Sequence, residues 1–143
     1  EFQERFFKHE IIRENIEFNS LIPELSVSNI ETSKKFYKNL GFKIVYERPE
    51  NKFCFIQLEN NQIMIEENNN NWNVGKMEYP YGNGINISMS VNNVENLYEQ
   101  LKAKDINFFI DFNMNEYRVD NKLFQDKEFL LQDPDGYLLR FNN

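Results

Sequence analysis

The chain has 143 residues, a formal net charge of −7 and 41% hydrophobic residues, which fits a single domain with one buried core. The acidic balance argues against a nucleic-acid partner, and no stretch approaches the ~20 apolar residues of a membrane span. Cys54 is the only cysteine, so no internal disulfide can form. We therefore expect a cytoplasmic protein without nucleic-acid or membrane partners, in which Cys54 is a buried apolar residue.

The first 20 residues stand apart from the rest of the chain. Their apolar residues can line one side of a helix, and they include His9, the only histidine. We expect residues 1–20 to be a helical extension that covers the domain or a partner subunit, and residues 21–143 to be a single domain. Because His9 lies in the extension, no histidine is available in the domain as a general base or for a Ser-His-Asp relay.

The domain contains an internal repeat. Residues 25–31, which read LSVSNIE, recur with small changes as residues 89–95, which read MSVNNVE. Each copy reads as a strand followed by an asparagine, Asn29 or Asn93, that caps a helix. Two copies are too few for a repeat array, so we expect one domain made of two similar halves.

Both predicted helices have one apolar face. The helical spacing i, i+3, i+4, i+7 is followed by Ile30, Ser33, Phe36, Tyr37 and Leu40 in the first half and by Val94, Leu97, Tyr98 and Leu101 in the second. Gly41 stands where it can end the first helix, because glycine readily adopts the left-handed conformation of a helix C-cap.

Strand-like segments follow each helix. In the first half they are residues 53–58 and 62–66; in the second half they are residues 129–132 and 137–141, joined by Asp133-Pro134-Asp135-Gly136. Proline presets the first turn dihedral, aspartate accepts local hydrogen bonds and glycine permits positive φ, so this segment predicts a β-hairpin turn.

Each half therefore reads β-α-β-β-β, and the expected fold class is α+β. The first module covers residues 21–67, a polar linker covers residues 68–83, and the second module covers residues 84–143. The second module is the longer one, and its extra residues fall between positions 112 and 127. We expect this insertion to be a functional loop.

The repeat, residues 35–42 (KFYKNLGF) and the turn at residues 133–136 together resemble the glyoxalase/bleomycin resistance protein/dioxygenase family of the vicinal oxygen chelate superfamily. The resemblance covers residues 21–143. It implies two βαβββ modules whose curved sheets enclose a cleft, commonly in a homodimer that completes two clefts.

Enzymes of this family commonly hold a divalent metal ion through His, Glu or Gln side chains. At the matching positions this chain has Ile22, Asn86 and Arg140, and only Glu66 has a ligand-like side chain. Sites of this kind need about three or four N or O donors, and the permanent cation of Arg140 would repel a metal ion. The resemblance is therefore strongest to the metal-free bleomycin resistance type, without metal, cofactor or catalytic residues. An ion pair between Glu66 and Arg140 is one interpretation of the altered positions.

The resemblance implies metal-independent binding of a small molecule, such as sequestration of a bleomycin-type antibiotic. Ligands of that type are cationic and carry flat aromatic rings, which suits an acidic chain with 15% aromatic residues. The candidate ligand-binding residues are Phe55, Glu66, Trp72, Asn86, Phe109, Phe112 and Arg140, with Phe53, Tyr117 and Phe124 as further candidate lining residues.

Other interpretations stay open. The main alternative is a divergent metal-dependent lyase, isomerase or dioxygenase of the same superfamily that uses Glu66 in an unusual metal site. Another is a regulatory or interacting domain in which residues 1–20 contact another protein. Trp72 is either an anchor packed onto the body or part of a ligand surface, and any one of the candidate aromatics can instead be ordinary core.

Overall fold

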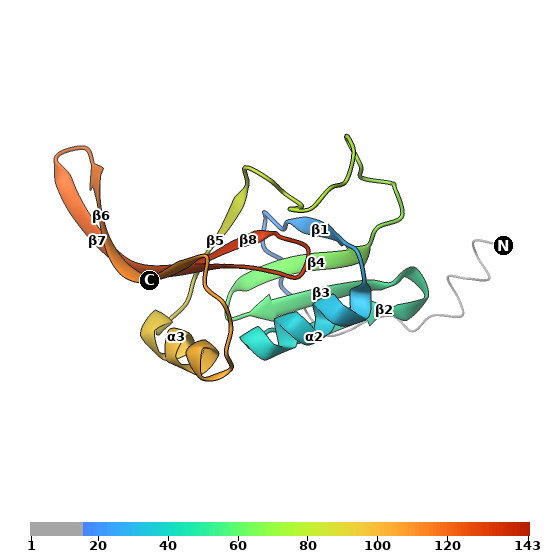
Figure 1. Cartoon of the computed structure of the whole chain (residues 1–143), viewed down its shortest axis with the longest axis horizontal. Helices are drawn as coiled ribbons and strands as arrows, with labels where there is room; N and C mark the ends of the chain where they lie inside the picture. Colours follow the sequence, from blue (N-terminus) through green and yellow to red (C-terminus); the bar gives the residue numbers. More distant parts are fainter. Residues whose placement is uncertain (1–15) are drawn as a thin grey trace.

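The computed structural model describes residues 16–143, which form two modules of one four-stranded sheet and one helix each (Figure 1). The first module consists of β1 (Glu24–Val27), α2 (Ile30–Leu40), β2 (Lys43–Arg48), the short 3-10 helix η1 (Pro49–Asn51), β3 (Phe53–Leu58) and β4 (Asn61–Glu67). The second module consists of β5 (Asn86–Ser90), α3 (Val94–Ala103), β6 (Ile110–Val119), β7 (Lys122–Gln132) and β8 (Leu138–Asn142).

The two sheets have equivalent topologies. The strand order is β1-β4-β3-β2 in the first sheet and β5-β8-β7-β6 in the second. In each sheet the first strand of the module runs parallel to the last strand, and the other neighbours are antiparallel. The predicted α+β fold of two βαβββ modules is therefore confirmed.

Asparagine side chains cap both helices, as the repeat predicted. The side-chain oxygen of Asn29 accepts a hydrogen bond of 3.0 Å from the backbone N–H of Thr32, and Asn93 accepts one of 3.0 Å from Asn96. Each bond satisfies a backbone donor that the first turn of a helix leaves free. Gly41 ends α2 with φ of 109°, the left-handed conformation predicted for it.

We expect replacement of either cap by alanine to lower the free energy of unfolding by about 1 kcal/mol. Asn29→Ala and Asn93→Ala should behave alike in chemical denaturation because their cap geometries match. Asn96→Ala is the control, since it leaves the Asn93 cap in place and puts a better helix former inside α3. Equal stabilities for Asn93→Ala and Asn96→Ala would contradict the capping role.

Both helices lie on one side of the sheets, whereas the linker and the end of the β6–β7 hairpin rise on the other side (Figure 1). The helix-facing side chains of both modules share one buried core, which includes Val27, Tyr37, Ile65, Met89, Phe129 and Phe141. Cys54 belongs to this core and is fully buried, as predicted. No helix among residues 16–143 is long and apolar enough to cross a membrane.

The turn between β7 and β8 joins the modules as well as the two strands. The Asp133 carboxylate accepts a 2.7 Å hydrogen bond from the Tyr37 hydroxyl of α2. The Asp135 carboxylate accepts one of 3.0 Å from the backbone N–H of Ser28, and the Tyr137 hydroxyl donates one of 2.8 Å to the carbonyl of Ser26. The predicted hairpin is thus also one of the contacts through which the second module holds the first.

The insertion in the second module is a hairpin, so the expected loop is a wrong prediction. β8 pairs with β7 only from Glu128 onward. Before that residue β7 pairs with β6 alone, from Met114↔Lys127 to Val119↔Lys122. We call residues 114–127 the arm. It is a two-stranded ribbon that extends beyond the sheet and bends away from the helices (Figure 1).

The connecting segments have no regular strand or helix. Residues 68–85 link β4 to β5, close to the predicted linker. Residues 1–15 of the expected helical extension lie outside the described residues, and residues 16–23 form no helix. The latter segment is tied to β4, because the Gln62 side chain accepts a hydrogen bond from the Asn19 N–H at 2.7 Å and donates one to the Glu17 carbonyl at 2.8 Å.

Candidate ligand-binding site

The side of each sheet that faces away from the helices forms what we call its inner face. Side chains alternate along a strand, so the neighbours of the core residues point to this face. In the first module they are Glu24, Ser26, Phe53, Phe55, Met64 and Glu66; in the second module they are Asn86, Ser88, Glu128, Leu130, Leu138 and Arg140.

The inner face of the first module is packed with aromatic rings. Phe55 stacks on Tyr46 with ring centroids 5.2 Å apart, and Phe18 covers it edge-on at 5.4 Å. The Arg48 guanidinium lies 4.0 Å from the centroid of the Phe53 ring. Phe55 is consequently only 1% exposed. A ligand can reach this predicted site residue only if the segment that carries Phe18 moves.

Two carboxylates lie near the edge of the same face. Desolvation and the adjacent Glu66 carboxylate raise the pKa of Glu24, and the Arg48 cation partly opposes this rise. Glu66 accepts a 3.1 Å hydrogen bond from the Asn69 side chain. These carboxylates give the first module a local negative charge that a cation would neutralise.

Arg140 does not pair with Glu66, so that interpretation of the sequence is wrong. Its Nη1 lies 3.8 Å from Oε1 of Glu128, a neighbour on the same sheet. The Glu128 side chain is 6% exposed, whereas that of Arg140 is 38% exposed. The buried Nε of Arg140 has no hydrogen-bond acceptor within residues 16–143. The guanidinium as a whole is partly exposed, so its terminal N–H groups can donate to an oxygen of a ligand on the inner face.

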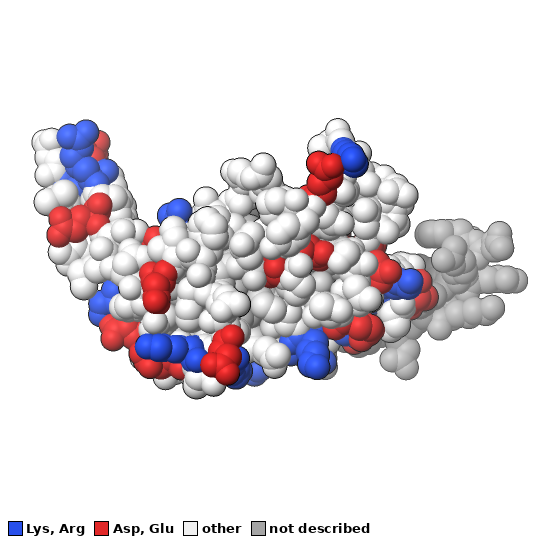
Figure 2. Space-filling view, viewed as in Figure 1, with Lys and Arg blue, Asp and Glu red and all other residues white. Residues whose placement is uncertain are grey.

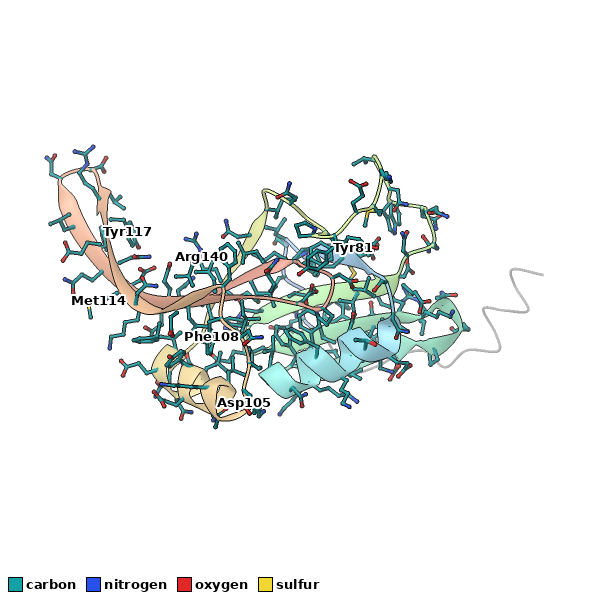
Figure 3. All side chains as sticks on the ribbon, in the orientation of Figure 1. Tyr81, Asp105, Phe108, Met114, Tyr117 and Arg140 are labelled. Carbon is teal, nitrogen blue, oxygen red and sulfur yellow. The ribbon has the colours of Figure 1, made fainter. Side chains whose placement is uncertain are left out.

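The arm continues the inner face of the second sheet. On this side Tyr117 stacks on Phe124, with centroids 5.8 Å apart and ring planes at 21°. Their exposed fractions are 49% and 42%, so both rings remain accessible. Asp126 follows on the same face, and its Oδ1 is buried without a partner in the described part of the chain. Figure 3 shows Tyr117 on the side of the arm that faces Arg140, and Met114 on the opposite side.

The remaining predicted residues lie in four different places. Asn86 is exposed on the edge strand β5 and lines a cavity of about 330 Å³ between the modules, together with Leu21, Gln62 and Ser88. Trp72 is 61% exposed in the linker, and Phe109 is 59% exposed just before β6. Phe112 packs against Tyr98 of α3 at 5.1 Å between centroids, which is the helix side of the sheet.

The structure therefore brings Asn86 and Arg140 onto one face and leaves Phe112 off it. Asp126 and Glu128 were missed as site residues; Asp126 lies in the arm, which was taken for a loop, and Glu128 directly follows the arm. Their alternation with Phe124 in the sequence is the signal that would have found them, since the period of two places all three side chains on one face of a strand.

The chain matches the sequence family described as the glyoxalase/bleomycin resistance protein/dioxygenase superfamily over residues 20–141. It belongs to this superfamily. None of the curated proteins matches the chain.

Two of the solved structures that are similar to this chain have the same fold. A glyoxalase/bleomycin resistance protein/dioxygenase from Alicyclobacillus acidocaldarius aligns with a TM-score of 0.62 at 20% identity, over 87% of this chain and 89% of its own. A bleomycin-binding protein complexed with bleomycin aligns with a TM-score of 0.61 at 18% identity, over 88% of this chain and 98% of its own. A superfamily member from Vibrio splendidus 12B01 is 31% identical over 83% of this chain and 92% of its own, with a TM-score of 0.38.

The inner face does not fit the metal centre of the superfamily's enzymes. Among residues 16–143, no three His, Cys, Asp or Glu side chains are grouped so that they could hold a metal ion. Ile22 has no donor atom, and the cation of Arg140 stands beside Glu128. The chain thus has the superfamily's fold, while the side chains at the positions that the resemblance matched to metal ligands supply too few donors for such a centre.

Proposed function

We propose that this superfamily member binds a small planar cation on the inner face of its second module, without a metal ion, and so sequesters a ligand such as a bleomycin-type antibiotic. The observation that carries the proposal is the exposed Tyr117–Phe124 pair beside the unpartnered oxygen of Asp126. With Cys54 buried as a free thiol, we place this function in the cytoplasm.

The Tyr117–Phe124 pair suits the flat ring of such a ligand, and the Asp126 carboxylate suits its positive charge. An aromatic cation gains from stacking on a ring and from the attraction between its charge and the ring's π-electrons. Asp126 adds a charge-assisted hydrogen bond, because its free oxygen can accept from the cation. Each interaction is stronger when both partners are shielded from water.

Arg140 and Glu128 extend this site toward β8. A ligand that reaches from the arm to β8 would meet the partly exposed guanidinium of Arg140 as a donor and the Asn86 amide at the edge of the sheet. An elongated molecule that carries both cationic and carbonyl groups fits this order. The bleomycin bound by the solved bleomycin-binding protein supports the choice of ligand class.

We expect calorimetry to detect binding of a bleomycin-type glycopeptide and, more weakly, of the planar cation proflavine. Tyr117→Ala and Phe124→Ala should each weaken binding about tenfold, which is the loss of one stacking contact. Asp126→Asn should weaken binding and reduce its salt dependence, because it removes the charge and keeps the shape. Met114→Ala, on the opposite side of the arm, is the control.

Two results would contradict the proposal. One is the absence of a heat of binding together with unchanged Trp72 fluorescence for both probes. The other is equal affinity in Tyr117→Ala, Asp126→Asn and Met114→Ala, which would place the ligand away from the arm.

The Glu24–Glu66 carboxylate pair favours the alternative, a metal-dependent lyase, isomerase or dioxygenase. Two neighbouring carboxylates can supply oxygen ligands, and burial together with the charge of Glu66 raises the pKa of Glu24. Metal analysis of protein purified without chelators separates the two functions. A stoichiometric divalent ion that is lost in Glu66→Gln would replace the first proposal by this one.

A further inference from the structure

We propose that the arm pairs edge to edge, along β6, with the arm of a second copy of this chain, so that the two arms form one four-stranded antiparallel ribbon. This contact is separate from the homodimer with shared clefts that the family resemblance implies. It uses the edge of a strand and leaves both faces of each arm open, so it is also independent of ligand binding on the inner face.

The strand β6 has a free edge along the arm. In the second sheet β6 is the outermost strand and pairs only with β7. Such an edge presents unpaired N–H and C=O groups to other chains, and proteins block it with proline, a β-bulge or charged side chains, lysine above all. The bulge of β6 lies between Ile110 and Asn113, and residues 114–119 contain neither proline nor lysine. The edge of the arm is therefore open to another strand.

The turn of the arm decides which residues present their backbone to this edge. The pair that flanks a two-residue hairpin turn takes the hydrogen-bonded position, and here that pair is Val119↔Lys122. Hydrogen-bonded positions alternate along an antiparallel ladder. Every second residue of β6 therefore directs its N–H and C=O away from β7, and these residues are Met114, Glu116 and Arg118.

Charge selects the register of the paired arms. A twofold axis must pass through a residue of β6, because an axis between residues would pair a residue that faces the edge with one that faces β7. An axis at Tyr117 sets Glu116 of each copy opposite Arg118 of the partner subunit. An axis at Glu116 or at Arg118 would set like charges opposite each other, which is destabilising. An axis nearer the turn shortens the overlap, and one nearer the body meets the bulge.

Both charges are available for these pairs. Glu116 and Arg118 are exposed, and neither takes part in a salt bridge within residues 16–143. The Glu116 carboxylate accepts one 3.0 Å hydrogen bond from the Gln125 side chain, which leaves its second oxygen available. Arg118 lies opposite Leu123, which carries no charge. Figure 2 shows basic and acidic side chains together on the arm, as a self-complementary edge requires.

The contact is confined to the arms. In an antiparallel ribbon the bodies of the two copies lie at opposite ends, and with the axis at Tyr117 the turn of one arm ends beside Met114 of the partner subunit. Because only residues 114–120 of each copy meet, the buried area lies below the roughly 1,200 Å² of standard interfaces. A two-stranded ribbon is marginally stable by itself, so pairing also stabilises the arm. We expect weak association that depends on protein concentration.

Sedimentation velocity over a concentration series tests the pairing. We expect at least tenfold weaker association in Glu116→Arg and in Arg118→Glu, because two attractive pairs become two repulsive ones. The double variant Glu116→Arg/Arg118→Glu restores opposite charges and should associate like the unmodified chain. Glu99→Arg makes the same charge change on α3 and is the control. The substituted side chains are exposed, so the variants should fold.

A mixture of the two single variants gives a second test. One copy then carries two arginines and the other two glutamates, so the mixture should associate more tightly than either variant alone. Three results would overturn the pairing. They are no association of the unmodified chain up to about 1 mM, equal association in Glu116→Arg and Glu99→Arg, and a double variant that associates as weakly as the single ones.

Discussion

Gly136→Ala is expected to lower the free energy of unfolding by about 2–5 kcal/mol, the sum of a left-handed backbone penalty and a steric clash. Gly136 has φ of +95°, and an added Cβ would lie 2.6 Å from Cβ and 2.7 Å from Cα of Pro80. The backbone of Pro80 cannot shift without moving the linker, which is hydrogen-bonded to the same turn through the N–H of Tyr81. The substitution therefore disturbs the β7–β8 turn and the linker together.

Chemical denaturation of three glycine variants separates the two causes. Gly84→Ala has φ of +89° but no atom within 4 Å of the added Cβ, so it reports the backbone penalty alone, about 1–2 kcal/mol. Gly75→Ala has neither positive φ nor a contact and should be neutral or slightly stabilising. Equal effects of Gly136→Ala and Gly84→Ala would show that the close approach of Pro80 is not constraining.

The sequence was sufficient to predict the fold where local signals agreed. The repeated strand and asparagine cap, the helical spacing that ends at Gly41, and the turn at residues 133–136 all predicted the same elements. Each signal depends on a single local requirement, such as a free N–H or a positive φ. Agreement among them left little freedom for another order of strands.

The arm was not predicted because its sequence lacks the usual signals of a hairpin. Its turn, between Val119 and Lys122, contains no glycine; Asp120 adopts φ of 54° there. Aspartate tolerates this conformation better than most residues. Both faces of the strands are exposed in the arm, so no buried face imposes alternation of apolar and polar residues along their whole length. The period-two spacing of Phe124, Asp126 and Glu128 is a short signal, and the pairing with β6 shows that it belongs to a hairpin.

The prediction for Phe112 failed because of a β-bulge. The register between β6 and β7 shifts between Ile110 and Asn113, and an extra residue moves the following side chains to the opposite face. Without the bulge, Phe112 would have lain opposite Glu128, on the inner face. The Glu66–Arg140 pair failed for another reason, since these residues belong to different sheets and Glu128 is the near neighbour of Arg140.

Asp133 should make the stability of the chain depend on pH in a direction opposite to that of ordinary surface carboxylates. Burial raises the pKa of Asp133 to about 6, and the Asp135 charge adds to the rise. Hydrogen bonds from the Tyr37 hydroxyl and from the N–H groups of Tyr137 and Asp135 act against it. The native state thus binds this proton more tightly than the unfolded state, whose pKa is near the usual 3.8.

The sign of the effect follows from this order of pKa values. Above pH 6 Asp133 is charged in the native state, and burying this charge lowers the free energy of unfolding by its full amount. Below about pH 4 Asp133 is protonated in both the native and the unfolded state, so this destabilisation disappears. The contribution of Asp133 to the free energy of unfolding should therefore rise by up to about 3 kcal/mol when the pH falls from 7 to 4. Other carboxylates titrate in the same range, so the measurement must be a difference between variants.

Asp133→Asn is the matched variant because it keeps the Oδ1 acceptor of the Asp135 and Tyr137 N–H groups and removes the charge. The unfolding free energy of the unmodified chain, minus that of Asp133→Asn, should increase as the pH is lowered from 7 to 4. Asp111→Asn is the control of opposite sign, since the Tyr98 hydroxyl lowers the pKa of Asp111 and its contribution is lost on acidification. If the difference for Asp133→Asn stays constant with pH, the native pKa of Asp133 is the same as in the unfolded state. The hydrogen bond from Tyr37 would then still join the modules, but burial of the Asp133 charge would not cost stability.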